Sequence, residues 1–225
     1  MAVILKDGSV FLHIPKTGGT WATGVLKELG LTRCSLGHRH ANWSHLLAPG
    51  NQGLGRKCEY LLKRSLHLQT SPRPFTFCFV RHPLDWYESF YAYKSQPSID
   101  WELDGDFENP DRWHPNSVLN GLGKGKTFNE FVEAVHNRFP GYVTALYSYY
   151  TLRPVDFVGK QETLREDLVR VLQERGFTFD REKVLGSERA NQSRPESKRL
   201  EWDADLREKV MRAEWAGITR FGYDK

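Results

Sequence analysis

The stretch Phe11-Leu-His-Ile-Pro-Lys-Thr-Gly-Gly-Thr-Trp21 predicts a short strand that passes through a glycine turn into a helix. Residues 9–14 are mostly apolar β-formers bounded by turn residues, which is typical of a buried strand. The glycine pair at 18–19 supplies a backbone that can take positive φ. From Thr20 to Leu29 the apolar residues recur at helical spacing. The segment therefore predicts a strand–turn–helix unit.

The turn of this unit has the features of a phosphate-binding loop. At the start of a helix, backbone N–H groups without helical partners converge with the positive end of the helix dipole. Lys16 adds a mobile positive charge, and Thr17 and Thr20 add hydroxyl donors. The spacing differs from the standard ATP-binding motif G-x-x-x-x-G-K-[ST]. We therefore expect a phosphate-binding loop of another kind.

A second glycine-rich segment, Gly121-Leu-Gly-Lys-Gly-Lys-Thr127, superficially resembles that ATP-binding motif. Its leading glycine is missing, and no convincing strand precedes it. Thr127 and Glu130 have the spacing of a capping box, which opens a helix with an apolar face. We interpret this segment as structural.

The block Phe75-Thr-Phe-Cys-Phe-Val-Arg-His-Pro-Leu-Asp-Trp-Tyr-Glu-Ser89 predicts another strand–helix unit. Residues 75–80 are apolar nearly throughout, as in a strand buried on both faces of a parallel sheet. Arg81 lies where that strand ends, and ligands gather at the carboxyl ends of parallel strands. A guanidinium from Arg81 and a hydroxyl from Ser89 would hold a second phosphate. The alternative is that Arg81 forms an ion pair with Asp85 at the strand end.

The alternation of strands and helices predicts an α/β fold, a three-layer sandwich with a parallel sheet between two layers of helices. We expect one domain over residues 1–225, because a chain of this length can bury a core without staples. An irregular insertion at about 95–126 matches no known pattern. The expected strands lie at about 9–14, 32–35, 75–80 and 155–159, and the expected helices at about 20–29, 83–95, 127–138, 142–151, 162–175 and 203–216.

The two phosphate motifs together resemble the sulfotransferases that use 3′-phosphoadenosine 5′-phosphosulfate (PAPS). Residues 15–20, Pro-Lys-Thr-Gly-Gly-Thr, are similar to their 5′-phosphosulfate loop, and residues 81–89 are similar to their 3′-phosphate motif. The sequence His-Ile-Pro-Lys-Thr-Gly-Gly-Thr at 13–20 resembles the carbohydrate branch of this family, such as the heparan sulfate 2-O-sulfotransferases, more than its cytosolic aryl and steroid enzymes. Weaker similarities lie at 157–162, 191–193 and 221–223. The resemblance implies the P-loop NTPase-like sulfotransferase fold.

The resemblance also implies a set of donor-binding residues. The late segment 187–199 is polar and basic, and we expect it to close over the 3′-phosphoadenosine. Lys16 would reach the bridging oxygen and stabilise the charge that develops there. The expected residues are Pro15, Lys16, Thr17, Gly18, Gly19, Thr20, Trp21, Arg81, Ser89, Asn191, Ser193, Arg194 and Lys198.

A hydroxyl acceptor needs a base, and histidine has the pKa for this role near neutrality. Histidines cluster in Gly37-His-Arg-His-Ala-Asn-Trp-Ser-His45. This segment resembles the His-x-His of the heparan sulfate 2-O-sulfotransferases, whose second histidine is the proposed base. The resemblance assigns that role to His40, with His38 as a neighbour that orients the substrate or the ring of the base.

Two other interpretations of this histidine cluster remain open. His38, His40 and His45 could bind zinc with Cys34 or Cys58, although the spacing is poor and no Cys-x-x-Cys pair is present. The segment could also be an ordinary polar loop. Of the other histidines, His82 could neighbour the donor and His13 is interpreted as structural, whereas His114 and His136 are given no role.

Composition narrows the class of protein and its environment. Three cysteines are too few for a disulfide framework, so we expect a reducing compartment. We find no signal peptide and no run long enough to span a bilayer, which favours a cytoplasmic enzyme of microbial or viral origin. The net charge of +4 hardly suggests a partner such as nucleic acid. The sequence does not indicate an oligomeric state.

The sequence thus predicts a metal-independent transferase of the EC 2.8.2 type, which moves a sulfuryl group from PAPS to a hydroxyl acceptor and leaves adenosine 3′,5′-bisphosphate. A carbohydrate or another small hydroxylated molecule is the favoured acceptor. Aromatic residues between Trp86 and Trp113 could stack on sugar rings, although core packing is the commoner role of aromatic side chains. The alternatives are a small-molecule kinase of the P-loop type, which would need Mg²⁺, and a non-catalytic module that binds sulfated or phosphorylated ligands.

Overall fold

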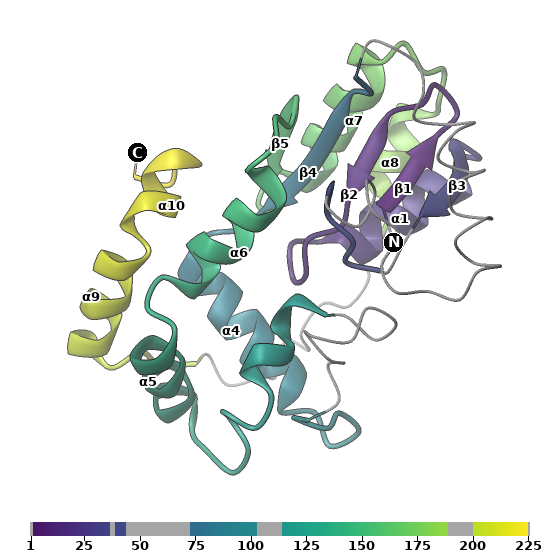
Figure 1. Ribbon diagram of the computed structural model, residues 1–225. Helices are drawn as coiled ribbons and strands as arrows, with labels where there is room; N and C mark the ends of the chain where they lie inside the picture. The colour runs from purple at the N-terminus through teal and green to yellow at the C-terminus, as the bar shows by residue number, and fades with distance from the viewer. Residues whose placement is uncertain (1, 37–38, 44–72, 103–113, 189–199, 225) are drawn as a thin grey trace, which may run out of the picture.

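A computed structural model describes residues 2–36, 39–43, 73–102, 114–188 and 200–224. Its centre is a five-stranded sheet with the strand order β3-β1-β2-β4-β5 (Figure 1). Strands β2, β4 and β5 run parallel to one another, and β1 runs antiparallel to both β2 and β3. The strands are β1 (Ala2–Leu5), β2 (Val10–Leu12), β3 (Thr32–Leu36), β4 (Thr76–Val80) and β5 (Phe157–Lys160).

The sheet is mixed, which corrects the expectation of a parallel sheet and confirms the α/β class. Strand β1 was not predicted, and a tight turn joins it to β2: the Leu5 N–H donates to the Ser9 carbonyl, and Gly8 has a φ of 89°. A connection this short forces the two strands to be antiparallel, since a parallel pair needs a long crossover. Strand β3 then pairs with β1 at the edge of the sheet.

Helices cover both faces of the sheet, because successive side chains of a strand point to opposite faces. In β4, Phe77 and Phe79 belong to the core shared with α1, α7 and α8. Cys78 and Val80 belong to the core shared with α4, α5, α6 and α9. The helices are α1 (Gly19–Glu28), α4 (Pro83–Lys94), α5 (Phe128–Arg138), α6 (Tyr142–Thr151), α7 (Leu164–Glu174), α8 (Arg181–Gly186), α9 (Ala204–Ala213) and α10 (Trp215–Arg220).

The local predictions on the helical side mostly agree with the structure. Helix α5 begins at the predicted capping box, in which the Thr127 hydroxyl accepts from the Glu130 N–H and the Glu130 carboxylate accepts from the Thr127 N–H. The helix predicted at 203–216 is two helices that meet at Glu214. The Glu214 carboxylate is fully buried and accepts from the N–H groups of Val143 and Thr144, at the start of α6. This contact holds α10 against α6 (Figure 1).

The insertion predicted as irregular contains a short 3₁₀ helix, η1 (Pro115–Leu119). The Tyr142 hydroxyl, at the start of α6, donates a hydrogen bond to the Pro115 carbonyl oxygen at 3.1 Å. Leu119 and the partly buried Trp101 pack into the core with α4, α5 and α6. The described part of the insertion is therefore attached to the helical layer. No helix in the described ranges is long and apolar enough to cross a membrane.

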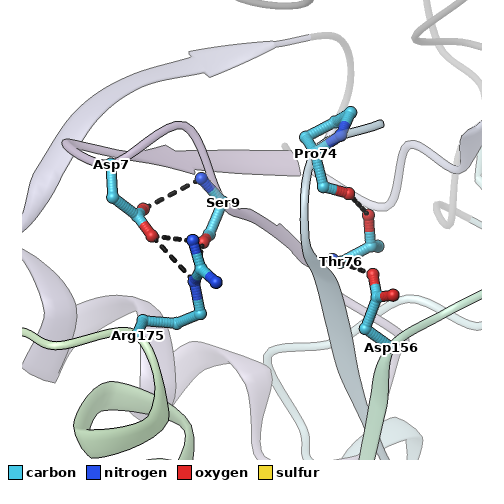
Figure 2. Close-up of polar contacts among 6 residues, drawn as sticks. All are labelled: Asp7, Ser9, Pro74, Thr76, Asp156 and Arg175. Atoms are coloured by element: carbon cyan, nitrogen blue, oxygen red, sulfur yellow. Dashed lines mark hydrogen bonds and ion pairs between the residues drawn. The ribbon is translucent and has the colours of Figure 1, made fainter. Parts of the chain in front are cut away.

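At the amino ends of the parallel strands, the carboxylates of Asp7 and Asp156 accept hydrogen bonds from neighbouring residues (Figure 2). Arg175 Nε, just after α7, donates to Asp7 Oδ2 at 2.9 Å, and the Asp7 carboxylate also accepts from the N–H and hydroxyl of Ser9. Beside β4 and β5, Asp156 Oδ2 accepts from the Thr76 N–H at 2.7 Å. This end of the sheet is thus closed by side chain and backbone hydrogen bonds.

Candidate functional site

The carboxyl ends of β2, β4 and β5 lie at the opposite edge of the sheet, and the residues that follow them form the candidate site. Lys16 lies in the loop after β2, and Arg81 directly follows β4. Glu162 follows β5, whose register with β4 places Lys160 beside Val80. Ligands of open α/β sheets bind at such an edge. The sequence correctly predicted that the first two segments meet here.

The loop after β2 has an unusual backbone. Lys16 has a φ of 66° and Gly18 a φ of 83°, so two left-handed residues lie directly before α1. A left-handed lysine costs about 1 kcal/mol or more, and such strain concentrates at functional positions. Left-handed residues that alternate with right-handed ones point successive N–H groups toward one concave side, which suits an anion. The first turn of α1 contains no acidic residue to compete with an anion.

Packing fixes the position of this loop from two sides. A Cβ atom at Gly19 would lie 2.1 Å from the ring of His13, so glycine allows the start of α1 to pack against that imidazole. The buried indole N–H of Trp86, on α4, donates to the Pro15 carbonyl at 3.0 Å. The loop is thereby held between the end of β2 and α4.

Three of the predicted donor-binding side chains make contacts within the protein. The Thr17 hydroxyl donates to the Ile14 carbonyl at 3.0 Å. Thr20 Oγ1 accepts from the Arg39 guanidinium at 2.6 Å. The Trp21 indole N–H donates to Ser187 Oγ at 3.1 Å. The groups in this loop that best suit an anion are therefore the backbone N–H groups and Lys16.

Lys16 has its Nζ 4.1 Å from the centre of the Tyr93 ring, on α4. An ammonium group over an aromatic face is stabilised by about 0.5–1 kcal/mol at an exposed site. Tyr93 is 37% exposed, so this ring lies at the surface. The contact keeps the charge of Lys16 beside the loop and between β2 and α4.

Arg81 is held by its backbone. Its N–H donates to the Tyr147 hydroxyl at 3.1 Å, and that hydroxyl donates to the Arg81 carbonyl at 2.8 Å. The Nε of Arg81 is buried and has no hydrogen-bond partner in the described part of the chain. Within the same residues, the alternative ion pair between Arg81 and Asp85 is not formed. Ser89 lies further along α4, which begins just after Arg81, and is half-buried.

Glu162 and Tyr223, which lie in the segments of weaker sequence similarity, contact His82 at this edge of the sheet. Glu162 Oε1 accepts from the His82 N–H at 3.0 Å, and Glu162 Oε2 accepts from the Tyr223 hydroxyl at 2.9 Å. The rings of His82 and Tyr223 lie edge to face, 5.3 Å apart. Burial and the neighbouring Glu162 carboxylate raise the pKa of Tyr223, so this phenol stays protonated. The contacts join the segments after β4 and β5 to the end of the chain.

His40 is buried behind the loop after β2. Its Nδ1 lies 3.0 Å from the His13 carbonyl oxygen, which only accepts hydrogen bonds. In the neutral ring the proton therefore lies on Nδ1, and Nε2 carries the lone pair. Burial and the nearby imidazoles of His13 and His114 lower the pKa of His40 well below its ordinary value of 6.5. The Tyr150 hydroxyl donates to the His40 carbonyl at 2.6 Å and fixes the backbone.

Three imidazoles meet at this position. The His40 ring lies edge to face against His13 and also against His114, with 4.7 Å between centres in both pairs. Burial, followed by nearby positive charge, lowers the pKa of His13 to about 3. The described residues contain no group of three or more potential ligands arranged for a metal ion. His40 and His114 each direct Nδ1 to a backbone group, so these nitrogens do not converge on one point.

Several predicted residues lie outside the described ranges. They are His38, Asn191, Ser193, Arg194 and Lys198, together with Cys58 and His45 of the zinc alternative. The structure also adds residues that sequence reasoning did not assign to the site: Arg39, Trp86 and His114. Arg39 and Trp86 lie inside segments that the motifs had singled out, whereas nothing in the sequence links His114 to His40.

Comparison with known proteins gives one match. The family model described as "Sulfotransferase family" matches residues 2–213, which include the loop after β2, His40, Arg81 and Glu162. No curated protein and no solved structure matches the chain significantly. The match covers nearly the whole chain of 225 residues.

Proposed function

Because this chain belongs to the sulfotransferase family, we propose that it transfers a sulfuryl group from PAPS to a hydroxyl group of its acceptor, with His40 as the base. Membership of the family supports sulfuryl transfer and an enzyme of the EC 2.8.2 type. The donor, the acceptor and the roles of individual residues are the finer part of the proposal. The observation that carries this finer part is the buried Arg81 Nε at the end of β4, which has no partner in the described residues.

The orphaned nitrogen of Arg81 fits a donor that carries a phosphate at this position. A buried cationic donor without a partner is costly, and a charge-assisted bond to a phosphate oxygen would satisfy it. In the proposal, Arg81 and Ser89 hold the 3′-phosphate, as their similarity to the family motif implies. Tyr147 supports this role because it fixes the Arg81 backbone on both sides.

The other phosphate of the donor would lie at the loop after β2. The left-handed Lys16 and Gly18 shape a concave backbone, and the start of α1 adds the positive end of its dipole. Pro15, Thr17, Gly19, Thr20 and Trp21 shape this loop in the proposal. Asn191, Ser193, Arg194 and Lys198 remain proposed donor contacts. Arg39 adds a second positive side chain at Thr20.

For the transfer, the bound donor supplies an electrophilic sulfur. His40 Nε2 accepts the proton of the acceptor hydroxyl as the new O–S bond forms. Lys16 stabilises the negative charge on the phosphate oxygen as the old S–O bond breaks. Burial keeps His40 unprotonated near neutral pH, so it enters the reaction as a base. His38 remains a proposed neighbour of this base.

A carbohydrate is the proposed acceptor. The support is the similarity of residues 13–20 to the carbohydrate sulfotransferases; the finer resemblance to the heparan sulfate 2-O branch remains a prediction. In the aromatic segment from Trp86, the rings of Trp86, Tyr87 and Phe90 pack in the core. Tyr93, 37% exposed and in contact with Lys16, offers an aromatic face to a sugar ring.

The test is calorimetric titration of the purified protein with adenosine 3′,5′-bisphosphate and, separately, with ATP. We expect the bisphosphate to bind equally with and without EDTA, and to bind more tightly than ATP. Preference for ATP with Mg²⁺ would instead support a kinase. Binding of the bisphosphate without transfer from PAPS to any of a panel of carbohydrates and phenols would support the non-catalytic module.

A further inference from the structure

The insertion between α4 and α5 brings a third histidine to the proposed base. His114 directly precedes η1, and its ring is perpendicular to that of His40, at an interplanar angle of 84°. The His40 ring also contacts His13, at an interplanar angle of 70°. Two edge-to-face rings therefore pack against the buried His40 imidazole.

His114 has a fixed position and a defined ring orientation. Its Nδ1 accepts from the Asn116 N–H at 3.1 Å, so a neutral His114 carries its proton on Nε2. The Ser117 hydroxyl donates to the His114 carbonyl at 2.8 Å. Asn116 is 1% exposed, and the Tyr142 hydroxyl bridges to its Oδ1 and to the Pro115 carbonyl. η1 is thus anchored on α6, and this anchor sets the location of the His114 ring.

The same helix, α6, also anchors the backbone of the base. Tyr150 donates to the His40 carbonyl, and the Tyr149 carbonyl accepts from the Asn42 side chain amide. Both ends of α6 therefore define the distance between His40 and His114, since Tyr142 lies at its first position. A perpendicular ring on such a rigid support restricts rotation of His40 about its side chain bonds.

We propose that His114 is a positioning residue for the base: its ring holds the His40 imidazole with Nδ1 on the His13 carbonyl and Nε2 left to accept the proton of the substrate. This inference rests on the proposed function, in which His40 is that base. It gives the insertion a role in catalysis that its sequence pattern does not indicate.

The ionisable surroundings predict how removal of His114 changes the pH profile. The imidazoles of His13 and His114 disfavour a positive charge on His40, and Arg39 disfavours one on His13, whereas the hydrogen bond to the His13 carbonyl favours protonated His40. Loss of the His114 imidazole removes one of these influences, so the pKa of His40 rises. Activity requires neutral His40, and the acid limb of kcat/KM therefore moves to higher pH.

Two substitutions test the ring of His114 and its hydrogen bond with the Asn116 N–H separately. His114→Asn keeps an acceptor for the Asn116 N–H and removes the ring. His114→Phe keeps a ring of similar size and removes the acceptor. The matched control is His136→Asn, a half-buried histidine on α5.

We expect kcat to fall about tenfold in His114→Asn with little change in KM, because misorientation of a catalytic group affects mainly the chemical step. In His114→Phe, kcat at pH 8 stays within about threefold of wild type because the ring is retained. The acid limb of kcat/KM moves to higher pH in both variants. His136→Asn matches wild type in every respect.

The readouts distinguish failure of this inference from failure of the proposed function. If His40→Ala is inactive while both His114 variants keep the wild-type kcat and acid limb, the positioning role is wrong. If His40→Ala retains turnover, the assignment of the base is wrong, whatever the His114 variants do. Binding of adenosine 3′,5′-bisphosphate to each variant confirms that it has folded. Should His114→Asn fail to fold, an unchanged acid limb in His114→Phe overturns the inference.

Discussion

The two ends of the parallel strands β2, β4 and β5 carry similar charged residues and use them differently. At the amino ends, Arg175 donates to Asp7, and Asp156 accepts from the Thr76 N–H (Figure 2). At the carboxyl ends, the buried Nε of Arg81 has no partner in the described part of the chain. One end is closed by its own carboxylates, and at the other a buried donor has no partner among the described residues.

The two ends also differ in where the backbone takes a positive φ. The turn between β1 and β2 places its positive φ at Gly8, where it causes no strain, whereas the loop after β2 places one at Lys16. Burial also keeps His13 and His40 uncharged at the carboxyl end. The comparison indicates that the amino end contributes to stability, whereas the carboxyl end binds the donor in the proposed function. Substitutions at the two ends should therefore affect different measurements.

The largest effect is expected at Lys16. Lys16→Ala should lower kcat about 10²- to 10³-fold, because it removes the charge that we propose stabilises the departing phosphate. The affinity of the Lys16→Ala variant for adenosine 3′,5′-bisphosphate should change much less than kcat. Steady-state kinetics and calorimetry of the same preparations measure both quantities. A loss of affinity with an unchanged kcat would show that Lys16 acts only in binding, and equal losses in both would contradict the assigned role.

Arg81 should affect binding of the donor. Arg81→Ala removes the proposed charge-assisted hydrogen bonds to the 3′-phosphate, worth about 1.5–3 kcal/mol, so the affinity for adenosine 3′,5′-bisphosphate should fall about 10- to 100-fold. The matched control is Arg175→Ala at the amino end, which should lose stability and leave the affinity unchanged. Calorimetry and urea unfolding distinguish the two variants. Similar losses of affinity and of stability in both variants would contradict the proposed difference between the two ends.

Asp156 should affect stability and leave catalysis unchanged. Asp156→Ala leaves the N–H of the buried Thr76 without its acceptor and removes the ion pair with Arg73. The loss of the buried acceptor should lower the free energy of unfolding by about 1–3 kcal/mol. The ion pair adds little, because it is partly exposed. A change in KM for the donor would contradict the separation of the two ends.

A second effect on stability is its dependence on pH. The pKa values of His13 and His40 lie below 6.5 in the folded protein, so below pH 6.5 the unfolded chain binds protons that the folded chain does not. Stability should therefore fall with decreasing pH, by up to about 1.4 kcal/mol per pH unit for each imidazole. Urea unfolding between pH 7.5 and pH 5 measures this slope. Replacement of His40 by Gln should reduce it, and an unchanged slope would show that His40 does not titrate as described.

Sequence patterns predicted the helices well where local signals were strong. The spacing of apolar residues located α1 and α7, and the Thr127–Glu130 pair located the start of α5, because these signals act within one or two turns of a helix. Strand β1 and its antiparallel pairing were missed. Its four apolar residues, Ala2–Leu5, show no alternation, since both faces of the strand are buried.

The sequence by itself determined the glycine turn before α1, the position of Arg81 and the membership of the family, because each depends on residues that are close in the chain. Only the tertiary structure decided which side chains have partners. Arg81 and Asp85 are near enough in sequence to pair, yet Tyr147 fixes the Arg81 backbone and no such pair forms in the described residues. The contact of His40 with His114 depends on the attachment of two distant segments to α6, and packing across a core leaves no periodic trace in the sequence.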